Sequence, residues 1–219
     1  MSNRETRIRF VLKPLAFLAG LAPLAVLAVW GVTGDLGANP VETINRFLGD
    51  WALRILLVSL AITPLARITG SATWVRFRRM AGLFAFFYAV LHLTSYVWID
   101  QHFDWTAIWS DIVKRTYITV GMAALLLLIP LAVTSPKAMV KRLGGRRWRK
   151  LHRLVYPAAI LVVVHYVLMT RADFLEPAIH GAVLAALLAW RLYDRRPPAL
   201  RAGGNGGKTP RPTRRRVVA

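Results

Sequence analysis

Histidine is the residue type in this chain that is best suited to hold a redox metal. The sequence has five histidines and no cysteine, which excludes disulfides, thiolate metal sites and iron–sulfur clusters. Two of the five, His92 and His165, lie inside long apolar stretches. An ionisable side chain at such a position is costly in a membrane and is usually functional. His92 and His165 are therefore the first candidates for metal ligands.

Six apolar stretches must position these side chains: residues 11–32, 51–66, 80–99, 118–133, 154–169 and 175–190. Each approaches the length that a helix needs to cross a hydrocarbon core of about 30 Å at about 1.5 Å per residue. Lipid offers the backbone no hydrogen-bond partners, so the spans must be helical. The composition, with 56% hydrophobic residues and a mean hydropathy of +0.44, excludes an ordinary soluble domain. The sequence predicts an all-α polytopic membrane protein, a six-transmembrane-helix bundle.

The basic residues gather on one side of the predicted bundle. Residues 1–13, 67–79 and 137–153 and the chain from residue 191 hold 25 of the 30 Lys and Arg residues and two of the ten acids, a net charge of +23. The other side has five basic residues and eight acids, a net charge of −3. The positive-inside rule then predicts that both termini are cytoplasmic. The overall charge of +20 reports topology and contact with anionic lipid rather than binding of nucleic acid.

The chain divides into a cytoplasmic N-terminus (residues 1–10), a transmembrane domain (11–193) and a basic tail (194–219) that its Arg, Pro and Gly content predicts to be disordered. The first apolar run exceeds a typical signal-peptide core, so we expect a retained span. The tail sequence AGGNGGKT is close to a phosphate-binding loop. Its Pro- and Arg-rich flanks supply neither the preceding strand nor the following helix, so we expect no nucleotide site there.

Matched depth links His92 and His165. His92 lies about 20 Å along the third predicted helix from its basic end, and His165 lies about 22 Å along the fifth. Two imidazoles at one level on separate helices can bind a haem iron from opposite faces, which suits electron transfer because no axial position stays open. Two histidines that form hydrogen bonds between helices fit the same spacing.

His152 is a third candidate, near the basic face. A second haem at that level needs a partner near position 78, which is Arg78. Arginine does not ligate iron but can pair with a haem propionate. His152 and His165 would lie roughly 140° apart on a straight helix, unless Pro157 kinks it. We expect His102 to be solvated and His180 to lie in the core or at the lipid interface.

Three segments carry a family resemblance: GDLGANPVETINRFLGDWALRILLVSLAITPLAR, RFRRMAGLFAFFYAVLHLTSYVW and LGGRRWRKLHRLVYPAAILVVVHY. With them, the chain from residue 18 to about residue 190 resembles the MsrQ (YedZ) family. These proteins are the haem-binding membrane subunits of the bacterial periplasmic protein-methionine-sulfoxide reductase system.

The resemblance implies a ferric-reductase-like transmembrane domain in the bacterial inner membrane that binds FMN and haem b, one or two. It implies His92, His152 and His165 as haem residues, with His92 and His165 as the axial pair, whereas Arg78 departs from the related oxidases. It also implies electron transfer from the quinone pool to a periplasmic molybdopterin subunit that reduces methionine sulfoxide in oxidised proteins. The chain itself would then have no substrate-reducing site. About 25 residues follow the sixth span, so a lipid-soluble donor or a separate reductase is expected.

Two other functions fit the same residues. One is a stand-alone b-type cytochrome or ferric reductase, and the other is a transporter whose buried histidines relay protons. Arg54 is expected to anchor its helix at the headgroups or to pair with a propionate. Aromatic and basic residues near the basic face are candidates for the FMN or quinone site. They are Trp74, Arg76, Arg79, Trp148 and Arg149. The same residues would equally form an interfacial belt of aromatic rings and snorkelling arginines.

Overall fold

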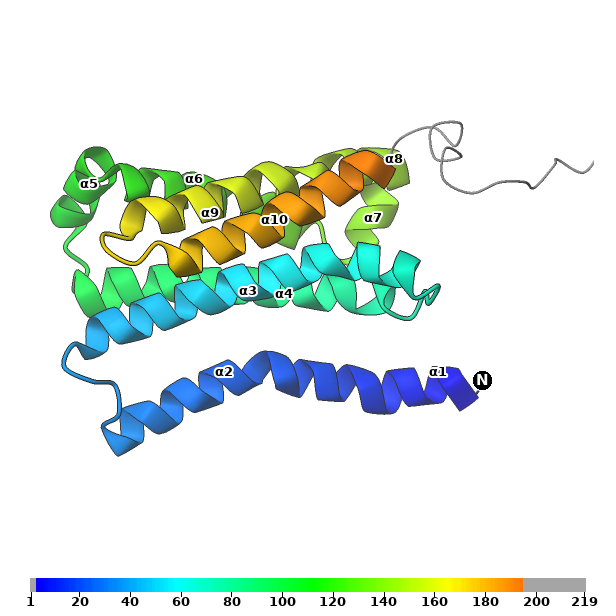
Figure 1. Cartoon of the computed structure of the whole chain (residues 1–219), viewed down its shortest axis with the longest axis horizontal. Coiled ribbons are helices and arrows are strands. Elements are labelled where there is room, and N and C mark those ends of the chain that lie inside the picture. Colours follow the sequence, from blue (N-terminus) through cyan, green and yellow to red (C-terminus); the bar gives the residue numbers. More distant parts are fainter. Residues whose placement is uncertain (1–2, 195–219) are drawn as a thin grey trace, which may run out of the picture.

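The computed structural model describes residues 3–194, whose regular secondary structure consists of helices joined by short turns (Figure 1). Six of its helical segments are long and apolar enough to cross a membrane. The α-helices are α1 (Asn3–Arg7), α2 (Lys13–Thr33), α3 (Pro40–Ile68), α4 (Val75–Thr94), α5 (Trp105–Lys114), α6 (Thr116–Val133), α7 (Lys137–Leu143), α8 (Gly145–Leu151), α9 (Val155–Met169) and α10 (Leu175–Asp194). Two π-helical turns, η1 (Ile8–Leu12) and η2 (Ser95–Asp100), and a 3₁₀ turn, η3 (His152–Leu154), extend them. The predicted all-α, six-span architecture is confirmed, while residues 195–219 of the predicted tail lie outside the described residues.

The second span begins eleven residues before the start predicted at residue 51. Asn39 caps α3, since its side chain accepts a hydrogen bond from the backbone N–H of Glu42. Pro40 occupies the first turn, where its missing N–H costs nothing. Polar residues in this first part of α3 lower the local hydropathy, which is why the apolar pattern alone placed the start too late. The amphipathic helix α5 was missed for the same reason.

The bundle consists of two helix pairs with two further helices on its outside. Helix α3 packs along α4, and α6 packs along α9, while α10 packs against α3 and α9. The main core joins these five helices through buried aliphatic side chains. They are Leu53, Leu56, Leu57 and Leu60 of α3, Ala85 of α4, Leu128 of α6, Ala158 and Ala159 of α9, and Leu184 of α10. Large apolar side chains on the outside, such as Val32 and Leu126, face the position of the lipid.

The basic segments lie at one end of the bundle. The N-terminal end, the turn between α3 and α4, helices α7 and α8 and the end of α10 are all found there (Figure 1). Helix α5 and the turn between α2 and α3 lie at the opposite end (Figure 1). Arg67 and Asp194 form an ion pair at the basic end, which joins the last turns of α3 and α10. This arrangement agrees with the alternation of loops from which the charge asymmetry was derived.

Helix α2 is the outermost helix and is fastened to α4 at one level. Gly20 lets the ring of Phe84 pack against the α2 backbone, because a Cβ at Gly20 would lie 2.6 Å from that ring. Tyr88, which is fully buried, donates a hydrogen bond of 2.8 Å to the backbone carbonyl of Gly20. The contact therefore depends on one glycine and one interhelical hydrogen bond.

Replacing Tyr88 by phenylalanine should lower the free energy of unfolding by about 1 kcal/mol, because this hydrogen bond is lost within the bundle. Unfolding of the purified chain in micelles would measure the change. Thr33→Val is the control, because it removes a hydroxyl whose hydrogen bonds, to Val29 and Asp35, stay within α2 and its exposed end. It should lower the stability by less than Tyr88→Phe. Equal stability of Tyr88→Phe and the unaltered chain would show that the hydrogen bond does not fasten α2.

Candidate functional site

His92 and His165 meet inside the bundle, as their matched depth predicts. His92 lies on α4 and His165 on α9, so each of the two helix pairs contributes one imidazole. The ring centroids are 6.2 Å apart and the ring planes are inclined by 75°. Both side chains are partly buried. The pairing therefore brings together two residues that are 73 positions apart in the sequence.

Hydrogen bonds fix the orientation of both rings in the same way. Nδ1 of His92 lies 2.9 Å from the backbone carbonyl of Asn45 on α3, and Nδ1 of His165 lies 2.6 Å from that of Tyr117 on α6. A carbonyl oxygen only accepts, so each Nδ1 carries the proton and donates. The Nε2 atom of each neutral imidazole then keeps its lone pair. A metal-ligating histidine is commonly held in this way by a bond from its other nitrogen.

A glycine lies one helical turn after each of these carbonyls. A Cβ at Gly49 would lie 3.1 Å from the ring of His92, and a Cβ at Gly121 would lie 2.9 Å from the ring of His165. Each ring thus rests on helix backbone that carries no side chain. We call the two arrangements, His92 with Asn45 and Gly49 and His165 with Tyr117 and Gly121, the histidine cradles. Sequence reasoning missed them, because the glycines matter only through contacts across helices.

The first cradle has an additional support at the end of α4. The Asn45 side-chain amide donates a hydrogen bond of 2.9 Å to the Ser95 hydroxyl and one of 3.3 Å to the His92 backbone carbonyl. The Ser95 hydroxyl donates a hydrogen bond of 2.8 Å to the same carbonyl. Ser95 is buried and begins the π-helical turn η2, a type of irregularity that is frequent at functional sites.

The donor set fits a haem better than a bare metal ion. Among residues 3–194, no group of three or more His, Cys, Asp or Glu side chains could hold a metal ion. Two imidazoles suffice for haem iron, whose other ligands come from the porphyrin. Two metal–nitrogen bonds of about 2 Å and two ring radii of about 1 Å would separate the centroids of axial imidazoles by about 6 Å. The observed 6.2 Å agrees with this separation.

His152 lies at the basic end and is engaged differently. Its ring stacks on Trp148 with centroids 3.9 Å apart, and its Nε2 lies 3.2 Å from the Thr134 hydroxyl. The Thr134 hydroxyl uses its one proton in a hydrogen bond of 2.6 Å to the Pro130 carbonyl. It therefore accepts a hydrogen bond from Nε2 of His152. An iron bond at Nε2 would have to displace this hydrogen bond. Ligation by His152 therefore stays a prediction.

A 3₁₀ turn interrupts the regular α-helix between His152 and His165. Helix α8 ends at Leu151, η3 follows over His152–Leu154, and α9 starts at Val155, two residues before Pro157. A proline at this position cannot donate a hydrogen bond to the preceding turn, which accounts for the break in the helix. The angle derived for a straight helix therefore does not apply here.

Arg78 forms its hydrogen bonds with α3. Its guanidinium donates a hydrogen bond of 3.4 Å to the Thr63 hydroxyl, and its backbone carbonyl accepts one from the Ser59 hydroxyl. Arg78 also lies within electrostatic range of His152. Its proposed contact with a propionate stays a prediction.

The remaining two histidines have unlike surroundings. His102 is exposed in a loop and has a positive φ of 48°. His180 lies at the opposite end from His152, and its Nδ1 donates 2.7 Å to the Glu176 carbonyl. It has polar company that the sequence did not suggest, because the fold gathers a polar cluster from α3, α9 and α10. The cluster consists of Asp50, Arg54, Tyr166, Glu176 and His180.

Within this polar cluster, the Tyr166 hydroxyl donates a hydrogen bond of 2.8 Å to the Glu176 carboxylate. A guanidinium nitrogen of Arg54 lies 3.9 Å from the same carboxylate. Arg54 also lies over the ring of Trp51, 5.5 Å from its centroid. Arg54 thus pairs with an acid and an aromatic ring of its own chain.

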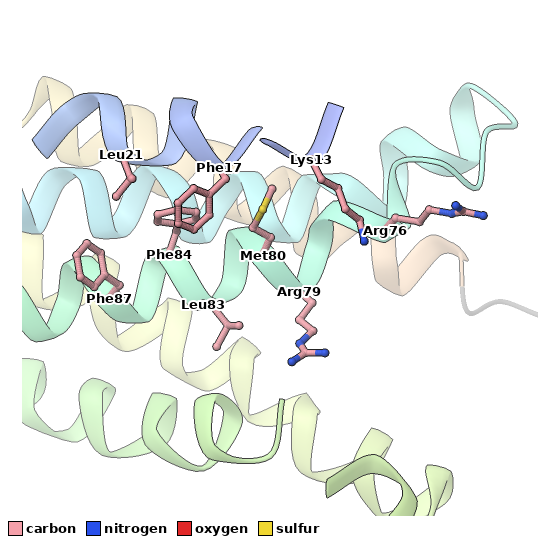
Figure 2. Close-up of a pocket in the computed structure, with 9 residues that line it drawn as sticks. All are labelled: Lys13, Phe17, Leu21, Arg76, Arg79, Met80, Leu83, Phe84 and Phe87. Atoms are coloured by element: carbon pink, nitrogen blue, oxygen red, sulfur yellow. The ribbon is translucent and has the colours of Figure 1, made fainter. Parts of the chain in front are cut away.

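The predicted belt residues at the basic end separate into different environments. The Trp148 ring packs against the His152 ring, and its indole N–H donates a hydrogen bond of 2.9 Å to the Thr134 backbone carbonyl. Trp74 and Arg149 are exposed. Arg76 and Arg79 line a groove between α2 and α4 (Figure 2), and neither His92 nor His165 is among its lining residues.

Comparison with known proteins agrees with this fold. Residues 48–163 match the family described as "Ferric reductase like transmembrane component", a range that includes His92 and His152 and ends two residues before His165. Three relatives carry the name "Protein-methionine-sulfoxide reductase heme-binding subunit MsrQ". The protein from Rhodospirillum rubrum is 62% identical over 175 residues, covering 80% of this chain and 82% of that protein. The one from Caulobacter vibrioides is 53% identical, covering 84% and 83%, and the one from Herminiimonas arsenicoxydans is 50% identical, covering 84% and 85%.

Two unrelated membrane proteins share apolar composition, but they do not share sequence identity of this level over most of both chains. The match extends across the histidine pair and its supporting helices, and the predicted resemblance is confirmed. The chain therefore belongs to the MsrQ family, and its six-span domain is of the ferric-reductase-like transmembrane type.

Proposed function

We propose that the chain is a membrane electron-transfer subunit that binds haem b between His92 and His165. The observation that carries the proposal is the pair of histidine cradles, whose ring centroids lie 6.2 Å apart and whose Nδ1 hydrogen bonds leave Nε2 of each ring unprotonated. The relatives' name, "heme-binding subunit", supports the same cofactor. Haem ligated on both faces supplies a one-electron carrier without an open position for oxygen.

The residues around the pair hold the ligands still. The Nδ1 hydrogen bonds prevent each ring from turning, and the absent side chains at Gly49 and Gly121 let the rings lie against the helices. Electron transfer benefits when the ligands move little between the two oxidation states, because preorganised polar groups reduce the reorganisation needed.

The finer proposal concerns the partners and the direction of transfer. We infer that the chain lies in the inner membrane with both termini cytoplasmic. It takes electrons from the quinone pool with the help of FMN and passes them to a periplasmic molybdopterin subunit. That subunit repairs oxidised proteins by reducing methionine sulfoxide. The charge of +23 on one side and −3 on the other supports this orientation. The name of the relatives supports a methionine-sulfoxide reductase partner.

An absorption spectrum of membranes that contain the chain, recorded before and after addition of a quinol, tests the function directly. We expect a low-spin b-type spectrum that quinol reduces, and co-purification of a periplasmic molybdoprotein when both are expressed. A chain without haem would contradict the proposal and favour a proton-relay transporter. Haem without such a partner would favour a stand-alone cytochrome or ferric reductase.

His152 gives a separate prediction about the entry of electrons. Replacing it by alanine should leave haem bound at His92 and His165, because His152 stacks on Trp148 and contacts neither ring. Reduction by the donor should slow severalfold, since the basic end is where the donor side would lie. Rapid mixing of variant membranes with quinol measures the rate. An unchanged rate would reduce His152 to an interfacial residue.

A further inference from the structure

A groove of about 480 Å³ lies between α2 and α4, on the outside of the bundle (Figure 2). Its walls are mainly apolar, and its basic residues gather towards the basic end of the bundle (Figure 2). The lining consists of Lys13, Phe17 and Leu21 of α2 and of Arg76, Arg79, Met80, Leu83, Phe84 and Phe87 of α4. Phe17 and Phe87 are exposed although they are large and apolar. Such side chains are expected to contact lipid when the helices span a membrane.

The groove runs along the contact between α2 and α4. Phe84 packs against Gly20 and lies 5.3 Å from Phe17, ring centroid to centroid. These two rings lie between the basic residues at one end of the groove and Leu21 and Phe87 at the other (Figure 2). Protein contacts hold the middle of α2 against α4, and at the basic end the described contact is the ion pair of Glu5, on α1, with Arg76.

Charge at the rim indicates what kind of molecule fits. Lys13, Arg76 and Arg79 are exposed cations, and no acidic residue lines the groove. The nearest acid among the described residues is Glu5, which lies 3.6 Å from Arg76 in a solvent-exposed ion pair. Such a pair contributes little and gives way readily to a stronger anion. A phosphate group is an anion that lysine and arginine bind well, and basic pockets between transmembrane helices characteristically take lipid headgroups.

We propose that this groove binds one anionic phospholipid. Its phosphate is held by Lys13, Arg76 and Arg79, and an acyl chain lies along Phe17, Leu83 and Phe87. The lipid fills the groove and joins the basic end of α2 to α4. This site is separate from the histidine pair, so the proposal holds whether or not the chain transfers electrons.

Native mass spectrometry of the full chain, after exchange into micelles with equal amounts of phosphatidylglycerol and phosphatidylcholine, tests the proposal. The unaltered chain should retain one phosphatidylglycerol. The variant Lys13→Gln/Arg76→Gln/Arg79→Gln should lose its preference for that lipid by on the order of 100-fold, since each cation near a lipid surface contributes about fivefold. A matched control, Lys141→Gln/Arg142→Gln/Arg146→Gln, removes one Lys and two Arg from exposed positions on α7 and α8 and should retain the lipid. The helical circular dichroism of each variant reports that it is folded.

A second measurement locates the lipid without removing any charge. The chain has no cysteine, so Phe17→Cys introduces a single thiol for a fluorescent label. Phosphatidylglycerol with a spin label on its acyl chain should quench this label several times more strongly than spin-labelled phosphatidylcholine. Val29→Cys, on the exposed part of α2 away from the groove, should show equal quenching by both lipids.

Three outcomes would overturn the proposal. The first is equal retention of the two lipids, and the second is a preference that survives loss of the three cations. The third is displacement of the bound lipid by inorganic phosphate, FMN or a quinone at micromolar concentration, which would assign the groove to a soluble anion or a redox molecule instead.

Discussion

Replacing His92 or His165 by alanine is expected to abolish the low-spin haem spectrum while the protein still inserts into the membrane. Each cradle holds one of the two axial ligands that we propose, so either change should remove one of them. The apolar helix surface of α4 and α9 is unchanged, and insertion depends on that surface. Reduced-minus-oxidised difference spectra at equal protein content measure the loss. Haem content should fall by tenfold or more in each variant.

Two further variants make this result specific. His102→Ala and His180→Ala should keep the full spectrum, because His102 is exposed in a loop and His180 donates to the Glu176 carbonyl. In His165→Gly, added imidazole should restore part of the low-spin spectrum by filling the space of the missing ring. A low-spin spectrum that persists in both alanine variants would refute the pairing.

Adding a single methyl group at Gly121 or Gly49 should weaken haem binding by about 10- to 100-fold, the usual cost of disturbing a residue that orients a metal ligand. The alanine Cβ would lie 2.9 Å from the His165 ring in the first case and 3.1 Å from the His92 ring in the second. Real Cβ atoms do not approach so closely at 2.9 Å, so His165 must move. We therefore expect the larger effect at Gly121. Haem titration of the haem-free chain, followed by absorption, measures the affinity.

The same glycine variants carry an internal control on stability. Alanine is favoured over glycine in a helix by about 1 kcal/mol, so helix propensity predicts a gain in stability for the haem-free chain. Gly82→Ala and Gly181→Ala place a Cβ 3.5 Å and 3.6 Å from the nearest side chain, an ordinary contact, and should leave haem affinity unchanged. Unaltered haem affinity in Gly121→Ala would show that the glycine does not shape the cradle.

Hydropathy and charge were sufficient to predict the six spans and the side of the bundle on which the basic segments lie. Helix depth was sufficient to bring His92 and His165 together, because depth in a membrane is a one-dimensional property that the sequence carries directly. The start of α3 at Pro40 was not found by hydropathy. It was nevertheless signalled by Asn39, Pro40 and Glu42, which form a regular helix N-terminus.

The histidine cradles and the surroundings of His180 could not be predicted from the sequence. A glycine opposite a ring is significant only when the rotation and the offset of two helices are known, and neither is fixed by apolar periodicity. Asp50 and Glu176 are far apart in the chain, and the packing of α10 against α3 and α9 brings them into one cluster. Contacts of this kind depend on tertiary packing, which a single sequence does not specify.

The repetition of the cradle in both helix pairs has a consequence for how the protein is made. Residues 40–94 carry one imidazole with its carbonyl and glycine, and residues 116–169 carry the other set. If His92 and His165 are the axial pair that we propose, neither segment holds both ligands by itself, and tight haem insertion should wait until the ribosome has delivered the second segment. The cofactor then links the early and late parts of the chain, and its binding free energy adds to their association. Cells short of haem should accordingly accumulate chains whose two segments separate more readily and are degraded sooner.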